Sequence, residues 1–381
     1  METLTNYDDQ YNVPEPIQPQ FEDYFEILGD TAGGMGEVYF CKDKRSGELY
    51  ALKKAQPEEN KRQLFEQEAA FALELGKHPN IVYTHTVGRK ENEYYIVMEL
   101  VASKSGQEND RPHGNTLKDE FNRRAEGIAP ETGFKWAIAF CEGMTYLNGK
   151  GMKAHKDIKP ENIFITPDGT LKIGDFGLAG LSAKKAIGTR GYRAPEVKDG
   201  NFSVRSDIYA FGVVLYQLFN KGYNPTEPTY YTKAGTRMDD QDAQFSQPQE
   251  IRSRYAERII RKCMALNPAK RYGHFKDLQA DLIQELKNIM PDYEYHAPEE
   301  ETMDEEEILN KALGWECLTN YDQAVKFYKL LDNSTSDYNV SSTSNTDIVL
   351  GEIVFSQFRD IQKTAKITDN DYQRTYARQI G

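Results

Sequence analysis

The stretch HKDIKPENIF, residues 155 to 164, places an aspartate, a lysine and an asparagine within six positions. Asp157, Lys159 and Asn162 stand just before the short apolar run 163–165, which predicts a loop that enters a short strand. Side chains of these kinds can position reactants and neutralise charge. The loop is therefore the first candidate for an active site.

Size and charge limit the classes of function that the chain can serve. The chain has 381 residues, and 60 acidic against 47 basic residues give a formal net charge of -13. The length predicts more than one folded unit. The acidic balance argues against nucleic acid or an anionic membrane as a partner.

The sequence carries no pattern that indicates secretion or membrane insertion. Apolar runs such as 208–219 are shorter than the roughly 20 residues of a membrane helix, and the N-terminus lacks a signal pattern. The four cysteines form no CxxC pair, which argues against a disulfide framework or a zinc site. We therefore expect a soluble cytoplasmic protein.

Apolar patterns divide the chain into segments. Residues 1–20 are polar and punctuated by prolines, which predicts a disordered tail. Strand-like runs and one amphipathic stretch follow over 21–101, and stretches with apolar residues every three to four positions fill 102–290. The sequence therefore predicts a small β-rich unit followed by a larger helical unit.

A third segment follows the two folded units. Residues 291–308 are acidic and predict a linker, whereas 309–381 predict a helical tail with a flexible Ser/Thr-rich segment at 333–347. The part 309–332 resembles one tetratricopeptide unit, but a single unit cannot bury its own apolar face. A helical pair that docks on the rest of the chain, or that binds a protein partner, is the alternative.

Three motifs in a fixed order carry a resemblance to a known family. HKDIKPEN at 155–162 is followed by KIGDFGLA at 172–179 and by GTRGYRAPE at 188–196. In order and spacing they resemble the eukaryotic-type (Hanks-type) serine/threonine protein kinase superfamily, with a glycine loop of bacterial type. The resemblance covers 21–290 and includes HPNIV at 78–82.

The resemblance implies an α+β fold with a small β-rich N-lobe at 21–101, a helical C-lobe at 102–290, and a C-terminal helical extension. It also implies an enzyme that transfers the γ-phosphoryl group of ATP to serine or threonine hydroxyls of proteins, including its own, with Mg²⁺ as cofactor. A non-catalytic scaffold whose tail binds protein partners is the alternative, because Lys156 replaces the usual arginine and the glycine pattern is irregular.

The resemblance assigns roles residue by residue. Lys53 would hold the nucleotide phosphates and Glu68 would orient Lys53, with Glu66 as the rival partner. Asp157 would be the general base, and Lys159 would neutralise charge on the transferred group. The expected magnesium ligands are Asn162 and Asp175.

The glycine loop permits two alignments with the family pattern. Counting back from Val38 puts Thr31 at a glycine position, whereas a hairpin two residues longer restores Leu28 and Gly29 to their expected roles. We prefer the longer hairpin. The residues expected to surround the nucleotide, besides Lys53, are Leu28, Gly29, Gly33, Gly34, Gly36, Val38, Ala51, Glu99 and Val101.

Overall fold

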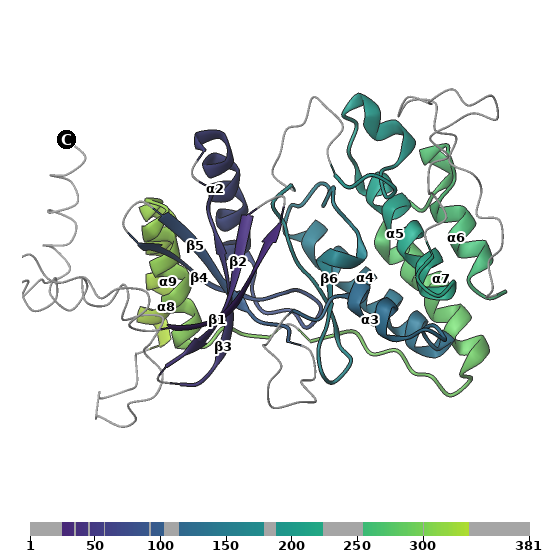
Figure 1. Cartoon of the computed structure of the whole chain (residues 1–381), viewed down its shortest axis with the longest axis horizontal. Coiled ribbons are helices and arrows are strands. Elements are labelled where there is room, and N and C mark those ends of the chain that lie inside the picture. The colour runs from purple at the N-terminus through teal and green to yellow at the C-terminus, as the bar shows by residue number, and fades with distance from the viewer. Residues whose placement is uncertain are drawn as a thin grey trace, which may run out of the picture.

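The chain folds into two lobes, a smaller β-rich N-lobe and a larger helical C-lobe (Figure 1). The computed structural model describes residues 25–33, 36–44, 46–56, 58–90, 93–102, 114–178, 188–223, 254–299 and 301–334. The predicted tail at 1–20 lies outside these residues. The α+β fold with two lobes is confirmed.

Five antiparallel strands form the sheet of the N-lobe, in the order β1-β2-β3-β5-β4. They are β1 (Phe25–Gly33), β2 (Gly36–Asp43), β3 (Leu49–Lys54), β4 (Thr84–Lys90) and β5 (Glu93–Glu99). Four consecutive residues of β3, YALK at 50–53, are buried, so both faces of this central strand are covered. The strand thereby carries Lys53 into the interior.

Helix α2 (Glu59–Glu74) packs on this sheet. Phe65, Ala69 and Leu73 are spaced four residues apart, so they share one face of the helix. All three are buried in one apolar cluster with residues of β4 and β5, among them Val87. One face of α2 is therefore committed to the core, and the opposite face is available to the site between the lobes.

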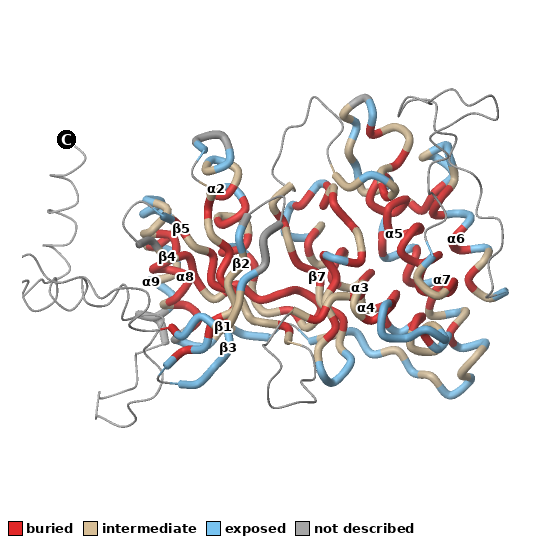
Figure 2. Tube along the Cα trace, in the orientation of Figure 1, coloured by how far each residue is buried: buried red, intermediate tan, exposed pale blue. Residues whose placement is uncertain are grey.

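The C-lobe is a bundle built around a central helix. Its helices are α3 (Leu117–Arg123), α4 (Pro130–Gly149), α5 (Val204–Phe219), α6 (Glu257–Cys263) and α7 (Phe275–Ile289). Residues 206–219 of α5 are all buried, as expected for a helix at the centre of a core. Phe211 of α5 stacks on Phe140 of α4 with 3.9 Å between ring centroids. Figure 2 shows buried residues concentrated along these helices.

A short hairpin, β6 (Ile163–Ile165) and β7 (Leu171–Ile173), lies between the helices of the C-lobe and the N-lobe sheet (Figure 1). The amide of Ile173 donates to the carbonyl oxygen of Asn80 (2.9 Å), and the amide of Val82 donates back to the carbonyl oxygen of Ile173 (2.8 Å). The hairpin therefore fastens the loop before β6 and the segment after β7 beside the N-lobe.

The C-terminal extension returns to the N-lobe. The chain after α7 runs back along the molecule, and helices α8 (Glu305–Cys317) and α9 (Tyr321–Ser334) lie beside β4 (Figure 1). Of the alternatives for this tail, docking on the rest of the chain is the one observed. Residues 335–381, which include most of the predicted flexible segment, lie outside the described residues.

A capping box fixes the start of α8 and corrects the predicted linker. The Asp304 carboxylate accepts a hydrogen bond from the amide of Glu307 (2.9 Å), and the Glu307 carboxylate accepts one from the amide of Asp304 (3.0 Å). Residues 305–308, predicted as linker, are helical for this reason. At the other end, α9 continues through Ser334, so the flexible segment predicted from 333 starts too early.

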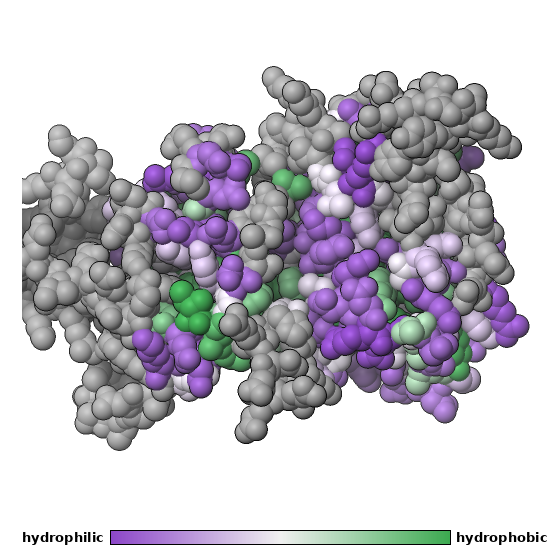
Figure 3. All heavy atoms as spheres, viewed as in Figure 1, coloured by the Kyte–Doolittle hydropathy of each residue, from purple (hydrophilic) through white to green (hydrophobic). Residues whose placement is uncertain are grey.

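Figure 3 shows that the coloured residues of this face are mainly hydrophilic, with a hydrophobic group beside β1. Ile27 of this strand is 48 % exposed. Single exposed residues of this kind are common on protein surfaces. Within the described part of the chain, no helix combines the length and the apolar character that a membrane span requires.

Candidate active site

The loop at 155–162 is held in place by a buried carboxylate of α5. Asp207 accepts hydrogen bonds from the amide of His155 (2.7 Å) and from the amide of Lys156 (3.0 Å). Burial raises the pKa of Asp207 to about 6, although these bonds favour its charged form. Lys156 has a φ of 71°, a left-handed conformation that is unusual outside glycine. The bonds to Asp207 offset the cost of this turn.

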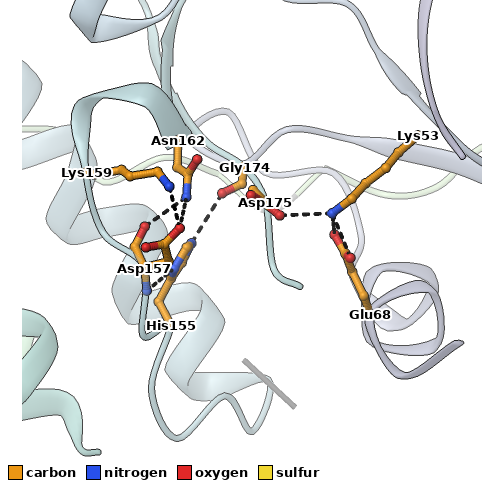
Figure 4. Close-up of polar contacts among 8 residues, drawn as sticks. All are labelled: Lys53, Glu68, His155, Asp157, Lys159, Asn162, Gly174 and Asp175. Carbon is orange, nitrogen blue, oxygen red and sulfur yellow. Dashed lines mark hydrogen bonds and ion pairs between the residues drawn. The ribbon is translucent and has the colours of Figure 1, made fainter. Parts of the chain in front are cut away.

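Asp157 lies at the centre of a converging set of donors. Its Oδ2 atom accepts from Lys159 Nζ (2.7 Å) and from Asn162 Nδ2 (3.1 Å), as Figure 4 shows. Its Oδ1 atom accepts from the Oγ1 atom (2.7 Å) and the amide (2.9 Å) of Thr189. Only 4 % of Asp157 is exposed. The carboxylate is therefore both buried and fixed in orientation.

Thr189 of the GTRGYRAPE motif, which the sequence analysis does not count among the site residues, belongs to this set. Its hydroxyl lies between the two charged groups of the loop, donating to Asp157 and accepting from Lys159 Nζ (2.9 Å). The available signal was the motif GTRGYRAPE, in which Thr189 is the first side chain with a hydrogen-bonding group. Sequence alone could not show that a residue 32 positions away contacts the loop aspartate.

A second charged group is centred on Lys53. Its Nζ atom lies 2.6 and 2.8 Å from the two carboxylate oxygens of Glu68 and 2.9 Å from Oδ1 of Asp175 (Figure 4). Glu66, the rival partner, instead pairs with Arg62 at 3.1 Å near the surface. The structure therefore brings together strand β3, helix α2 and the segment after β7 at one ammonium group.

Electrostatics hold Lys53 and Asp175 in their charged forms, whereas burial raises the pKa of Glu68. Burial alone would lower the pKa of Lys53, but the Glu68 and Asp175 carboxylates raise it above the ordinary lysine value. Burial alone would likewise raise the pKa of Asp175, but the Lys53 ammonium holds it below the ordinary aspartate value. Both residues therefore stay ionised at neutral pH.

The Asp-Phe-Gly run at 175–177 is fitted closely against α2. A Cβ atom on Gly177 would lie 2.9 Å from Oε2 of Glu68, so a side chain cannot be placed there without moving the glutamate. Phe176 is buried and meets Phe71 of α2 edge to face, with 6.0 Å between ring centroids. The position of α2 thus determines the geometry of the site.

The strand register decides between the two alignments of the glycine loop. Gly33 pairs with Gly36 and Thr31 pairs with Val38, so two residues connect the strands and the longer hairpin that we preferred is wrong. The register instead shifts between Ile27 and Gly29, a bulge that adds a residue within β1. Leu28 lies in this bulge, and Gly34 lies outside the described residues. A nucleotide contact by Leu28 or Gly29 stays a prediction.

Strand pairing puts other predicted nucleotide residues on one face of the sheet. Val38 lies directly opposite Lys53, and Ala51 precedes Lys53 by two residues. Opposite residues and residues two apart point to the same side of a sheet. Val38 and Ala51 therefore share the face from which the lysine reaches Glu68.

The connection between the lobes contains the remaining two predicted residues. Oε1 of Glu99, at the end of β5, accepts from the amide of Tyr83 (2.7 Å) and from Lys172 Nζ of β7 (2.8 Å). The carbonyl oxygen of Val101 accepts from the amide of Asn115 in the C-lobe (2.8 Å). These bonds to both lobes fix the connection at the mouth of the site.

Asn162 and Asp175, the predicted magnesium ligands, carry the kinds of oxygen atom that a magnesium ion binds. Asn162 Nδ2 donates to the carbonyl oxygen of Asp157 (2.9 Å), which leaves the amide oxygen as the side-chain atom for a cation. The carbonyl oxygen of Asn162 accepts from the amide of Gly174, so the loop lies beside Asp175 (Figure 4). Carboxylate and amide oxygens are ligands that Mg²⁺ prefers, usually in small number alongside phosphate oxygens.

Comparison with known proteins agrees with this geometry. The protein kinase domain family matches residues 24–283. Similar proteins include the probable serine/threonine-protein kinase PknB of Lactococcus lactis, 32 % identical over 212 residues, and the serine/threonine-protein kinase PknB of Mycobacterium leprae, 29 % identical over 290 residues. These matches cover 52 % and 70 % of this chain, but only 32 % and 43 % of the two relatives. Since the family matches well over half of the residues, and since the two charged groups lie where its motifs require, the chain belongs to the protein kinase family.

Proposed function

We propose that the chain is an ATP- and magnesium-dependent protein kinase that phosphorylates serine and threonine. The observation that carries the proposal is the contact of Lys53 with Glu68 and Asp175 at once, beside an Asp157 that is oriented by its own set of donors. Perturbed and paired charged groups that converge in this way are a feature of catalytic sites. The relatives named serine/threonine-protein kinases support the same class.

The proposed reaction moves one phosphoryl group. The hydroxyl oxygen of a substrate serine or threonine forms a bond to the γ-phosphorus of ATP, the bond between that phosphorus and the bridging oxygen breaks, and ADP leaves. Asp157 accepts the hydroxyl proton, and Lys159, 2.7 Å from it, offsets negative charge on the transferred group. Lys53, braced by Glu68, holds the phosphates.

Asn162 and Asp175 would hold the magnesium ion in this proposal. Bound Mg²⁺ would offset the negative charge of the phosphates. In the structure, Lys53 and the hydrogen bonds of the loop already orient both side chains.

The alternative, a non-catalytic scaffold, has less support. It rested on the irregular glycine loop and on Lys156. The compact register keeps Thr31 at a glycine position, so the first irregularity remains, whereas the amide of Lys156 is anchored to Asp207. The side chain of Lys156 lies over the ring of Phe202, 5.7 Å from its centroid. Neither feature disturbs Asp157 or Lys53.

Phosphoryl transfer can be measured directly. Protein incubated with γ-labelled ATP, Mg²⁺ and a generic protein substrate should label serine and threonine, and chelation of the metal should abolish the label. Mass spectrometry of the chain itself should locate phosphate in the predicted segment 333–347, because a tethered segment has a high effective concentration. Label on tyrosine alone, or none with a range of protein substrates, would contradict the proposed function.

The choice between the two glutamates gives a matched pair of variants. We expect Glu68→Gln to lower kcat/KM by about 10²-fold, because a neutral amide braces Lys53 poorly and small displacements at a catalytic site are costly. Glu66→Gln should change kcat/KM by no more than about twofold, since exposed ion pairs such as that with Arg62 contribute little. Equal losses of kcat/KM in the two variants would show that Glu68 is not the glutamate on which the function of Lys53 depends.

A further inference from the structure

Helix α8 packs into the corner between the C-terminal end of α2 and strand β4. The Thr86 hydroxyl of β4 donates to the carbonyl oxygen of Asn310 (2.8 Å), and Lys77, just after α2, forms an ion pair with Glu307. The family match ends at residue 283, so these contacts come from beyond the shared domain. The N-lobe of this chain is completed by its own C-terminal segment.

Lys311 of α8 is a fully buried lysine that binds the end of α2. Its Nζ atom donates to the carbonyl oxygens of Ala72 (3.2 Å) and Thr84 (2.8 Å). The Ala72 carbonyl is one of the last four of α2, which have no partner within the helix and form the negative end of its dipole. Burial lowers the pKa of Lys311 to about 7. The free-energy cost of burying the Lys311 ammonium is offset by its hydrogen bonds to Ala72 of α2 and Thr84 of β4.

Gly314 of α8 shows how closely the two helices approach. A Cβ atom at this position would lie 2.7 Å from Cδ2 of Leu73 in α2 and 3.0 Å from the backbone nitrogen of Val87 in β4. Glycine inside a helix costs about 1 kcal/mol relative to alanine. The close contact with α2 and β4 explains why glycine occupies this position despite that cost.

Helices α8 and α9 form a helical hairpin, called here the α8–α9 hairpin, and both helices take part in apolar packing. Trp315 of α8 and Ala324 of α9 are only 3 % and 2 % exposed. They belong to the apolar cluster that contains Phe65, Ala69 and Leu73, the core face of α2. The α8–α9 hairpin thus shares one apolar core with the face of α2 that packs on the sheet.

The other side of α2 carries the catalytic contacts. Glu68 holds Lys53 at 2.6 Å, and Phe71 packs on Phe176 of the Asp-Phe-Gly run. α2 is thereby held between the hairpin and the active site. We propose that the α8–α9 hairpin is an internal support that keeps α2 in place, and that Lys311 and Gly314 are positioning residues for the Lys53–Glu68 pair. This inference rests on the proposed kinase activity for its catalytic consequence, but not for its structural one.

Point variants of the full-length chain test this proposed role of the α8–α9 hairpin without removing it. Gly314→Leu should push α8 away from α2, and Lys311→Met should leave two buried carbonyls without their donor. Each should lower kcat/KM by about tenfold or more and raise the KM for ATP, because Lys53 loses its fixed partner. Amide hydrogen exchange in 59–74 should rise, while exchange in α4 and α5 should not. Gly314→Ala is the smaller change if Gly314→Leu does not fold, and its effects should have the same direction.

A destabilised control separates positioning from general loss of stability. Leu278 of α7 is fully buried in the C-lobe and has no part in the site. Leu278→Ala should lower the melting temperature as much as the α8 variants do, or more, yet keep kcat/KM within about twofold below that temperature.

Two results would contradict the proposal that the α8–α9 hairpin keeps α2 in place. The first is unchanged exchange in 59–74 in folded Gly314→Leu or Lys311→Met, and the second is raised exchange with kcat/KM equal to that of wild type. A wild-type protein that transfers no phosphate would contradict the proposed function instead, while the exchange comparison would still decide whether the hairpin holds α2.

Discussion

Asp157→Asn should lower kcat by about 10²- to 10⁴-fold, the range typical for the loss of a general base. This corresponds to roughly 3 to 5 kcal/mol of activation free energy. The structure gives the reason, since Lys159, Asn162 and Thr189 all donate hydrogen bonds to the Asp157 carboxylate. An amide in its place cannot accept the hydroxyl proton. Steady-state phosphoryl transfer measures the loss.

The fold should survive this substitution. Asparagine keeps the shape of the side chain and one acceptor oxygen, so the expected cost is about 1–3 kcal/mol for the donors that lose their partner. Asp168, in the exposed turn between β6 and β7, is the matched control, and Asp168→Asn should leave turnover unchanged because its bonds stay within that turn. Turnover near that of wild type in Asp157→Asn would rule out the assigned base.

Arg271→Ala should lower the free energy of unfolding by about 3–5 kcal/mol, as expected when one partner of a buried ion pair is removed. The Arg271 side chain is completely buried and binds both carboxylate oxygens of Glu196, at 2.6 and 2.9 Å. It also donates to the carbonyl oxygens of Ala265 (2.7 Å) and Arg205 (2.9 Å). The alanine variant removes the Arg271 donor from all of these acceptors. Chemical denaturation measures the change.

Arg258 provides the control for an arginine of the same lobe. Its side chain is 57 % exposed and pairs with Asp281 (2.9 Å) and Glu285 (3.4 Å). Because exposed ion pairs contribute little, Arg258→Ala should cost less than about 1 kcal/mol. Similar losses in the two variants would mean that burial of the Arg271 pair does not stabilise the C-lobe in the way described.

That the loop residues lie together could be predicted from sequence, because their arrangement is local. Asp157, Lys159 and Asn162 lie within one short loop, so their spacing alone brings them together. The partner of Lys53 is different, since Glu68 and Glu66 are two residues apart on one helix. Such residues are about 200° apart around the axis, so only one of them can face Lys53. The rotation of α2 about its own axis, relative to the sheet, determines that Glu68 faces Lys53.

The glycine hairpin shows where counting residues fails. The family pattern assumes regular pairing from the glycines back to the start of β1, but the register shifts between Ile27 and Gly29. A bulge adds a residue on one strand without a strong local signal. Motif alignment therefore placed the irregularity in the turn, whereas pairing between Gly33 and Gly36 places it inside the strand.

The C-terminal extension illustrates which features follow from the sequence and which depend on the tertiary structure. Apolar periodicity in the sequence predicted two helices in this region, whereas the capping box of Asp304 and Glu307 became evident only in the structure. Periodicity shows that a helix has a face to bury, but it does not identify the surface that covers that face. Only the tertiary structure placed Lys311 against the end of α2, because that contact joins residues 239 positions apart and depends on the shape of the folded N-lobe.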